Sequence, residues 1–416
     1  MKARLLAVLI ACGAACLADA QAIDLSAAAA SELRSKIDLV TWDDGGAISN
    51  FVYRHPSEIF PAAVPAARAP HPRELPVRLR EDVAQFRFAD GQTLQQYVDQ
   101  GSIDGLLVVQ HGTIVFERYP RMRADDRHIS FSVTKAFVGT LVVLLEEDGR
   151  LDLSQPAARY LPELANTVWA GIKLRDVADM ASGIDGKEEA DSYTNPQQKI
   201  YRMEAALGWQ PRRDDMPPSV RAGDAYGYIA TMGKGREPGT RFEYSSIDTL
   251  MLAQVLERIT GRRLSDLLSE RIWGRMGAES DGLMLVNERG VAVAHAGLAM
   301  TARDLARFGL LFTDPSRGAV IPAAVRERMF GQGRPALLPP DHPRHFTHAS
   351  YQWDQVNERG TLFKGGFGGQ GLFVDVRRDV VMVMFGTNAT VDAKPAPMPI
   401  LTLVPALFPE TEVKSP

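Results

Sequence analysis

The stretch ISFSVTKAFVGTLVVLLEEDG, residues 129–149, constrains the fold of this chain more than any other segment. Its apolar residues fall on nearly every side of a helix, and a helix that is apolar all round belongs in the protein interior. Ser132 and Lys135 nevertheless stand one helical turn apart at its beginning. A lysine ammonium there is disfavoured by desolvation and by the positive end of the helix dipole. Either Lys135 points into water, or its burial has a chemical purpose.

A serine and a lysine separated by two residues form a short pattern that also arises by chance. Taken alone, it is better explained by a helix-capping Ser132 and a solvent-facing Lys135. In a buried helix, however, the Ser132 hydroxyl meets the free N–H groups of the first turn, which can stabilise an oxyanion. Lys135 falls on the same face, and burial lowers its pKa so that a neutral amine can accept the serine proton. The pair is therefore a candidate nucleophile and base.

Two further segments carry residues suited to the same chemistry. Tyr244 stands directly before a helical pattern at 245–261. A phenol beside a lysine ammonium is expected to have a lowered pKa and to exchange protons with the serine and the leaving group. The segment 363–376, FKGGFGGQGLFVDV, places glycines before a strand, where a substrate can approach the backbone closely. The alternatives are a core tyrosine at the start of a helix and a flexible turn before a hairpin.

The first twenty residues have the parts of a signal peptide. Two basic residues precede an apolar stretch at 5–17, and an A-x-A site ends at Ala20, so we expect cleavage there and a periplasmic or secreted protein. The apolar stretch is too short to span a bilayer. Lipid anchoring at Cys12 is the alternative. Cys12 and Cys16 are the two cysteines of the chain, so the mature protein would have no disulfide.

Hydrophobic periodicity predicts an α+β fold. The segment 105–119 indicates two strands joined at His111 and Gly112, and 368–386 indicates a second hairpin. The middle of the chain is mostly helical, so a sheet made from two distant segments should enclose a helical insertion. The expected parts are a signal peptide at 1–20, an N-terminal extension at 21–90, a sheet domain from 91–150 and 345–416, and an inserted mainly helical domain at 151–344.

Local signals indicate how some segments begin and end. The proline-rich stretch 56–76 should run extended over a surface. Gly183 and Gly261 should each end a helix. Thr301 and Asp304 occupy the capping-box positions of a helix that starts there.

Composition and motifs exclude several classes of protein. The 416 residues are 45% hydrophobic and 24% charged, as in a soluble globular protein, and the net charge of -4 gives no signal for a nucleic-acid partner. Dinucleotide, phosphate-loop and G-x-S-x-G motifs are absent from the sequence, so we expect no cofactor. His342, His345 and His348 have a metal-like spacing, but Pro343 argues against a helix that presents them together. We therefore expect a solvated loop there, no metal and no membrane span. The oligomeric state is left open.

The three segments with candidate catalytic residues, in this order, resemble the serine penicillin-recognising superfamily of class C β-lactamases, D-alanyl-D-alanine peptidases and related esterases. The best matches are SFSVTKAF, VADMASGI, PGTRFEYSS, HAGLAMTARDLARFGLL and GGFGGQGLFVD, within about 105–387. The resemblance is closest to the branch of the 6-aminohexanoate-dimer hydrolases. It implies a β-lactamase/DD-peptidase-like fold, in which helices flank an antiparallel sheet and a helical domain is inserted.

The resemblance also implies roles for single residues. Ser132 would be the nucleophile, Lys135 its proton partner, and Tyr244 a second catalytic base or acid. The backbone N–H groups of Ser132 and Phe367 would form the oxyanion hole. The expected reaction is cleavage of an amide or ester through an acyl-enzyme.

Two residues are candidates for substrate contact. Tyr193, in the segment DSYTNPQQ, matches a position that contacts substrate in the 6-aminohexanoate-dimer hydrolase branch. His295, close before a glycine, is a candidate for the wall of the cleft, and a structural histidine is the alternative.

The sequence also departs from the family pattern. K-T-G is absent, and Lys364 directly precedes GGFGG, which we interpret as too close to the glycines for the family lysine. Ser246 replaces the asparagine of Y-x-N. Because the K-T-G lysine helps hold the substrate carboxylate in β-lactamases and peptidases, these departures favour a small linear amide or ester. The alternatives are β-lactamase or D-alanyl-D-alanine peptidase activity, or a non-catalytic relative that keeps the cleft for binding.

Overall fold

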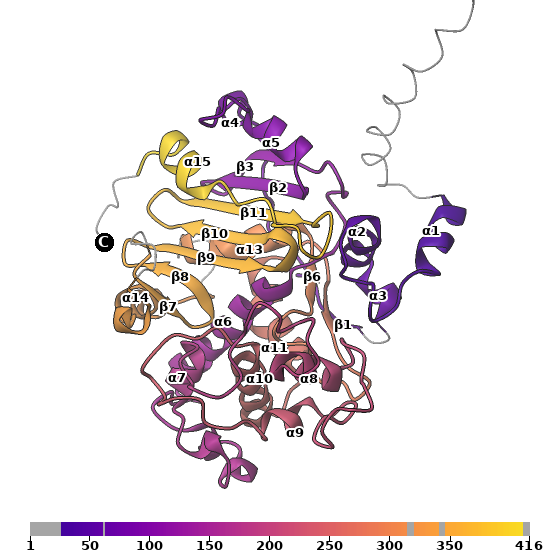
Figure 1. The fold of residues 1–416 in the computed structure, drawn as a ribbon. Helices are drawn as coiled ribbons and strands as arrows, with labels where there is room; N and C mark the ends of the chain where they lie inside the picture. The colour runs from indigo at the N-terminus through magenta and orange to yellow at the C-terminus, as the bar shows by residue number, and fades with distance from the viewer. Residues whose placement is uncertain (1–25, 61–62, 314–319, 341–345, 411–416) are drawn as a thin grey trace, which may run out of the picture.

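The computed structural model describes residues 26–60, 63–313, 320–340 and 346–410 (Figure 1). The expected signal peptide and both cysteines lie outside these residues. The centre of the molecule is a seven-stranded sheet in which each strand is antiparallel to its neighbours. In spatial order the strands are β3 (Thr113–Arg118), β2 (Ile103–Gln110), β11 (Val380–Gly386), β10 (Gln370–Asp375), β9 (Thr361–Gly366), β8 (Trp353–Asn357) and β7 (His348–Ser350).

Both predicted hairpins are confirmed. β2 and β3 are joined by His111 and Gly112, whose φ angles of 49° and 71° are the positive values that a tight two-residue hairpin turn requires. β10 and β11 form the second hairpin, and β11 pairs with β2. The fold is thus α+β, and its sheet joins a segment before residue 120 to one after residue 345.

The sheet is buried on both faces because apolar side chains line both sides of its central strands. In β11, Val381 and Val383 face the large core that contains α6 (Thr134–Glu147) and α13 (Ala302–Thr313). Met382 and Met384 face a smaller core that the C-terminal helix α15 (Ile400–Leu407) covers. A strand that is covered on both faces has a continuous apolar sequence, as VVMVMFG does.

A second, four-stranded sheet carries the segment that leads to Ser132. Its order is β1 (Ala63–Ala66), β5 (Gly282–Leu285), β6 (Leu298–Met300) and β4 (His128–Ile129), and all its pairings are antiparallel. β4 pairs with β6 and ends three residues before Ser132. The strand therefore fixes the backbone at the beginning of the α6 segment.

The N-terminal segment packs into the body of the protein. It contains α1 (Ala27–Arg34), α2 (Gly46–Arg54) and α3 (Pro56–Ile59), and it continues through α4 (Glu81–Ala84) to α5 (Leu94–Gln100). Trp42 and Tyr53 of this segment belong to the large core. The expectation of an extended run from residue 56 is wrong at its start, because Pro56 occupies the first turn of α3, where a missing N–H costs nothing.

The remaining helices lie mostly on the far side of α6 from the sheet, toward the bottom of Figure 1. They are α7 (Leu174–Ala178), α8 (Lys199–Leu207), α9 (Ala225–Ile229), α10 (Ser246–Thr260) and α11 (Leu264–Leu268), with α14 (Ala323–Gly331) beside β7. The short helix α12 (Gly274–Met276) contacts α13. Gly261 ends α10 in the left-handed conformation, as predicted. Gly183 does not end a helix: α7 stops at Ala178, and Gly183 lies in the loop beyond it.

The predicted capping box at α13 is half present. The Asp304 N–H donates to Thr301 Oγ1 at 3.1 Å, as an N-cap requires. The Asp304 carboxylate instead accepts the backbone N–H groups of Glu279 and Ser280, so it joins the helix to a neighbouring loop. Among the described residues, no helix combines the length and apolar character that a membrane span needs.

Candidate active site

The chain makes a strained turn immediately before Ser132. Phe131 has a φ angle of 43°, an unfavourable value for a residue with a large side chain. Its ring packs on Tyr53 and Trp42 at centroid distances of 4.8 and 6.1 Å, which holds this conformation in place. Backbone strain of this kind persists only where the surroundings enforce it, and it is concentrated at functional sites. Ser132 follows in a short 3₁₀ turn, Phe131–Val133, that leads into α6.

Lys135 points into the protein and not into solvent. Its side chain is fully buried, and its Nζ donates hydrogen bonds to Ser132 Oγ at 2.8 Å and to the His295 carbonyl oxygen at 3.0 Å. Burial lowers the pKa of Lys135 to about 7, and the nearby charge of Lys364 acts in the same direction. A large share of the amine is therefore neutral near neutral pH and lies within hydrogen-bond reach of the serine proton.

Tyr244 lies between two lysines. Lys135 Nζ and Lys364 Nζ are 5.0 and 4.6 Å from its ring centre, and Lys364 also donates to Tyr244 Oη at 3.2 Å. The predicted lowering of the phenol pKa is wrong. Burial raises the pKa of Tyr244 well above its usual value, and the charges of Asp354 and Glu188 add to this effect. A hydrogen bond with the Ser132 hydroxyl acts in the opposite direction but is outweighed. Tyr244 is thus a neutral phenol, suited to donate a proton.

Lys364, which we expected to lie out of place, belongs to the site. It extends from β9, is fully buried, and contacts Asp354 Oδ1 at 2.5 Å in addition to Tyr244. The sequence KGG therefore places a lysine beside the tyrosine without a K-T-G motif. The expectation failed because distance along the sequence to the glycines does not determine where a strand residue points.

The glycine-rich segment at the end of β9 comes close to the backbone beside Ser132. A Cβ atom on Gly366 would lie 2.8 Å from the carbonyl oxygen of Ser130, so only glycine fits there. Phe367 follows at once and packs edge-on against Phe131 at a centroid distance of 5.5 Å. The Gln370 side-chain amide donates to the carbonyl oxygens of Phe367 and Gly386, both at 2.8 Å, and fixes the turn. This arrangement brings the two predicted oxyanion-hole residues, Ser132 and Phe367, to the same cavity.

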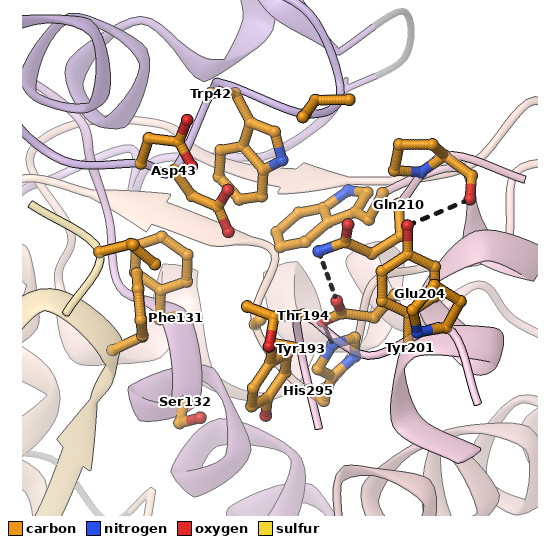
Figure 2. Close-up of a pocket in the computed structure, with 18 of the residues that line it drawn as sticks. Trp42, Asp43, Phe131, Ser132, Tyr193, Thr194, Tyr201, Glu204, Gln210 and His295 are labelled. Carbon is orange, nitrogen blue, oxygen red and sulfur yellow. Dashed lines mark hydrogen bonds and ion pairs between the residues drawn. The ribbon is translucent and has the colours of Figure 1, made fainter. Parts of the chain in front are cut away.

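That cavity has a volume of about 510 Å³ and an acidic interior. Figure 2 shows Ser132 at its lower end and Trp42 and Asp43 at its upper end. Both predicted substrate contacts line it. The described residues that line it are Val40, Trp42, Asp43, Asp44, Phe131, Ser132, Ala190, Tyr193, Thr194, Pro196, Tyr201, Glu204, Trp209, Gln210, Pro211, Arg213, His295, Ala296, Phe367, Val391 and Asp392.

Two carboxyl groups in the cavity hold their protons unusually strongly. Burial raises the pKa of Glu204, on α8, to about 8, with the charge of Glu188 as the second cause. The pKa of Asp43 is raised to about 7 by burial and by the charge of Glu204. Because each carboxylate would be stabilised by a cation, this part of the cavity is suited to a positively charged group.

His295 contacts both Lys135 and the carboxyl group of Glu204. Its carbonyl oxygen accepts from Lys135, while its ring Nε2 lies 3.0 Å from Glu204 Oε1. Burial lowers the pKa of His295 to about 3, and the charge of Lys135 contributes, so the ring is neutral. The structure thus gives His295 a structural contact in addition to its place on the cavity wall.

Tyr193 is held by a carboxylate that the sequence did not reveal. Its hydroxyl donates to Glu188 Oε2 at 2.5 Å and lies 3.5 Å from Ser246 Oγ. Glu188 Oε1 accepts the Ser246 backbone N–H at 2.8 Å, and the Glu188 N–H donates to the Tyr244 carbonyl oxygen at 2.8 Å. Through these three hydrogen bonds, Glu188 fixes Tyr193, the first turn of α10 and the backbone of Tyr244 relative to one another.

The histidine cluster is only partly described. His342 and His345 lie outside the described residues. His348 is buried in β7, and its Nε2 lies 3.1 Å from the Met329 carbonyl oxygen. Within the described ranges, no group of three or more histidine, cysteine or acidic side chains is arranged to hold a metal ion.

Four acidic residues of the site were missed in the sequence: Asp43, Glu188, Glu204 and Asp354. Asp43, Glu188 and Glu204 stand in no pattern that marks them, because tertiary packing alone brings them to the cavity. Asp354 had a usable signal. The turn at 358–360 closes a hairpin, and its register places residue 354 opposite residue 364, as the pairing of Gln355 with Phe363 shows.

The fold and this site define a serine hydrolase of the β-lactamase type. The chain belongs to the β-lactamase family, whose profile, described as Beta-lactamase, matches residues 91–401. A 6-aminohexanoate-dimer hydrolase of Paenarthrobacter ureafaciens is 34% identical over 334 residues, which cover 78% of this chain and 82% of that protein.

Solved structures agree with this assignment. A protein from Bacillus anthracis assigned as a 6-aminohexanoate-dimer hydrolase superposes with a TM-score of 0.72 at 25% identity, covering 86% of this chain and 92% of the other. A protein from Bacteroides dorei assigned as a β-lactamase gives a TM-score of 0.58 at 18% identity, covering 76% of this chain and 96% of the other, and shows the shared fold.

Proposed function

We propose that this protein is an exported serine hydrolase that cleaves a small linear amide or ester through an acyl-enzyme on Ser132. The observation that carries the proposal is the buried Lys135 amine, 2.8 Å from Ser132 Oγ and with a pKa lowered to about 7. A neutral amine at this distance activates a serine hydroxyl as a nucleophile.

In the proposed steps Lys135 begins as a neutral amine and Tyr244 as a neutral phenol. Lys135 accepts the proton of Ser132 as Oγ attacks the substrate carbonyl carbon. The N–H groups of Ser132 and Phe367 stabilise the oxyanion. Tyr244 gives its proton to the leaving nitrogen or oxygen, and the Lys135 ammonium then returns a proton to the phenolate. Water attacks the acyl-enzyme by the same transfers in reverse, which releases the acid and restores Ser132.

The acidic cavity supports an amide with a free amino group as the substrate. The relative from Paenarthrobacter ureafaciens is named for the 6-aminohexanoate dimer, a linear amide of an amino acid. We propose that Glu204 and Asp43 bind the substrate ammonium while its carbonyl carbon lies at Ser132. Their raised pKa values would then fall, because an ammonium favours the carboxylate form.

A covalent probe tests whether the protein is an enzyme or a binding relative. A fluorophosphonate should label the wild-type protein at Ser132, and Ser132→Ala should remove the label. Absence of labelling in the folded wild-type protein would contradict the enzyme and favour a non-catalytic relative that uses the cleft for binding. Side-by-side assays of p-nitrophenyl esters, nitrocefin and linear amide dimers then rank the substrate classes. A nitrocefin rate above the rates for esters and amides would favour the alternative β-lactamase or peptidase activity.

Export is a proposal from residues 1–20 alone. The expected mature protein begins after Ala20 and occurs in the periplasm or medium. N-terminal sequencing of the protein from each cell fraction tests this, and a lipid-modified Cys12 at the mature N-terminus would show the anchored alternative.

A further inference from the structure

Lys364 and Asp354 form an ion pair across the β8–β9 hairpin, directly beside Tyr244. Lys364 Nζ lies 2.5 Å from Asp354 Oδ1 and donates to Tyr244 Oη at 3.2 Å. The lysine side chain has no exposed surface, whereas the carboxylate is 23% exposed. The ion pair therefore belongs to the site, and Asp354 is the member that lies nearer to solvent.

The two lysines beside Tyr244 have different kinds of partner. Lys135 donates to a hydroxyl and to a carbonyl oxygen, both neutral groups. Lys364 donates to a carboxylate and to the phenol. In a buried site, neutral acceptors favour the amine and a carboxylate favours the ammonium. Burial lowers the pKa of Lys364, but the charge of Asp354 and its hydrogen bond act in the opposite direction. The geometry therefore assigns the cation to Lys364, which has the carboxylate partner, and leaves Lys135 free to act as the base.

We propose that Asp354 is a positioning residue that holds Lys364 as an ammonium against the Tyr244 hydroxyl and away from the substrate. The inference rests on the proposed acyl-enzyme function. When Tyr244 gives its proton to the leaving group, the Lys364 ammonium stabilises the phenolate until the proton of Lys135 replaces it. Lys364 makes no bond to substrate and keeps its own protons throughout.

The same pair defines what the site does not recognise. A substrate carboxylate can bind a lysine only if the ammonium is accessible or can exchange its partner. Lys364 is fully buried and already pairs with Asp354. The ion pair therefore removes this lysine from substrate recognition, so the site does not require a substrate carboxylate at this place.

Asp354 also has a purely structural contact, which the test must separate. Its Oδ2 accepts the Gly365 N–H at 3.0 Å and so fixes the end of β9 before Phe367. If this contact were its whole role, replacing Asp354 would have the same effect whether or not Lys364 is present. A role through Lys364 predicts instead that the two substitutions do not add.

A double-mutant cycle decides between these roles. We would measure the acylation rate with p-nitrophenyl butyrate in wild type, Asp354→Asn, Lys364→Met and the double variant. Each single variant should lose about ten- to a hundredfold, the size of coupling between charged groups in contact. In the Lys364→Met background, Asp354→Asn should change the rate by no more than about twofold. Wild-type acylation by Asp354→Asn, or an equal loss in both backgrounds, would overturn the proposal.

Two controls keep the outcome interpretable. Asp354→Asn leaves a buried lysine without a carboxylate and can fail to fold for that reason, but the double variant removes both charges. A folded double variant must still show the ten- to hundredfold loss predicted above, and wild-type acylation by it overturns the proposal. Asp375→Asn, which breaks the Asp375–Arg378 pair at the other end of β10, is the matched control and should acylate normally.

Fluorophosphonate labelling separates this inference from the proposed function. If the wild-type protein is not labelled at Ser132, the acyl-enzyme proposal fails and this inference fails with it. If the wild-type protein is labelled while folded Asp354→Asn acylates at the wild-type rate, only the role of Asp354 is refuted.

Discussion

Lys135 Nζ donates a hydrogen bond to Ser132 Oγ at 2.8 Å, although the lysine side chain is fully buried. A charged amine at the beginning of a buried helix would be unfavourable, and burial accordingly lowers the pKa of Lys135 to about 7. The same property that makes this lysine costly to bury makes it able to accept the serine proton. The burial of Lys135 therefore costs stability and at the same time provides a base.

The first prediction concerns the pH dependence of catalysis. With p-nitrophenyl butyrate, kcat/KM should rise with pH through about 7, because Lys135 must be neutral to accept the proton. Activity should be low below this pH, where the amine is protonated, and should level off above it. A pH–rate profile measures the midpoint. A profile that stays flat across neutrality contradicts a role for the neutral amine.

Lys135 should also lower the stability of the fold. Its pKa is about 7 in the folded state against 10.5 in the unfolded chain, so the unfolded state binds more protons between these values. The free energy of unfolding therefore rises with pH across that window. The penalty for burying Lys135 is largest at and below the folded pKa of about 7 and disappears above 10.5. Lys135→Met removes the penalty and should be inactive but about 0.5–2 kcal/mol more stable at neutral pH.

Urea unfolding at neutral pH and near the upper end of that window measures the difference between Lys135→Met and wild type. The advantage of the methionine variant should shrink as pH rises, since the wild-type lysine becomes neutral in both states. A variant that is less stable at both pH values would show that the lysine is not a source of strain.

The helix that carries Lys135 and directly follows Ser132 could be predicted, because so apolar a run must be buried. Its beginning could not, because the strained Phe131 is held by Trp42 and Tyr53, which come from a distant segment. The hairpins were predictable for a similar local reason. His111 and Gly112 form a tight turn between two strands, and this turn can be predicted without knowledge of any distant contact.

The third prediction tests the acidic end of the cavity. Glu204→Gln keeps the hydrogen-bonding shape beside His295 but removes the carboxylate that an ammonium would pair with. For a linear amide with a free amino group, kcat/KM should fall about ten- to a hundredfold, mainly through KM, as expected for one lost charged hydrogen bond. For the neutral p-nitrophenyl butyrate it should hardly change.

Two comparisons make the Glu204 result specific. The same amide with its amino group acetylated should be an equally poor substrate for wild type and variant. Glu163→Gln, at an exposed glutamate paired with Arg258, should behave as wild type with every substrate. Equal losses with the amine-bearing amide and with the neutral ester would point to a structural role for Glu204 instead.

The fourth prediction is slow turnover of β-lactams. Lys364 is present beside Tyr244, but Asp354 already holds its ammonium, so a β-lactam carboxylate lacks this partner. Nitrocefin turnover should stay well below the rates of about 1–10³ s⁻¹ that are common for enzymes on their substrates. Rapid nitrocefin hydrolysis in a spectrophotometric assay would show that Lys364 is available to substrate.

Much of the charge in the site lay beyond sequence reasoning. Glu204 and Asp43 meet in the cavity only because α8 and the N-terminal segment pack on either side of it. The direction of the Tyr244 pKa was misjudged for the same reason: the lysine neighbour was foreseen, but the burial and the carboxylates that outweigh it were not. Asp354, in contrast, could have been predicted, since the strand register alone places it opposite Lys364.

We propose that Lys135 acts by transferring a proton and not by its charge. Arginine keeps a fixed charge and does not serve as a base at ordinary pH. Lys135→Arg should therefore lose acylation about as fully as Lys135→Ala, by the roughly 10²- to 10⁴-fold typical of removing a general base. Circular dichroism and thermal unfolding establish that both variants are folded.

The acylation rate of folded Lys135→Arg with p-nitrophenyl butyrate is the most direct measurement. The proton-transfer role predicts a rate close to that of Lys135→Ala. An electrostatic role predicts that arginine retains much of the wild-type rate, and that result would remove Lys135 from proton transfer.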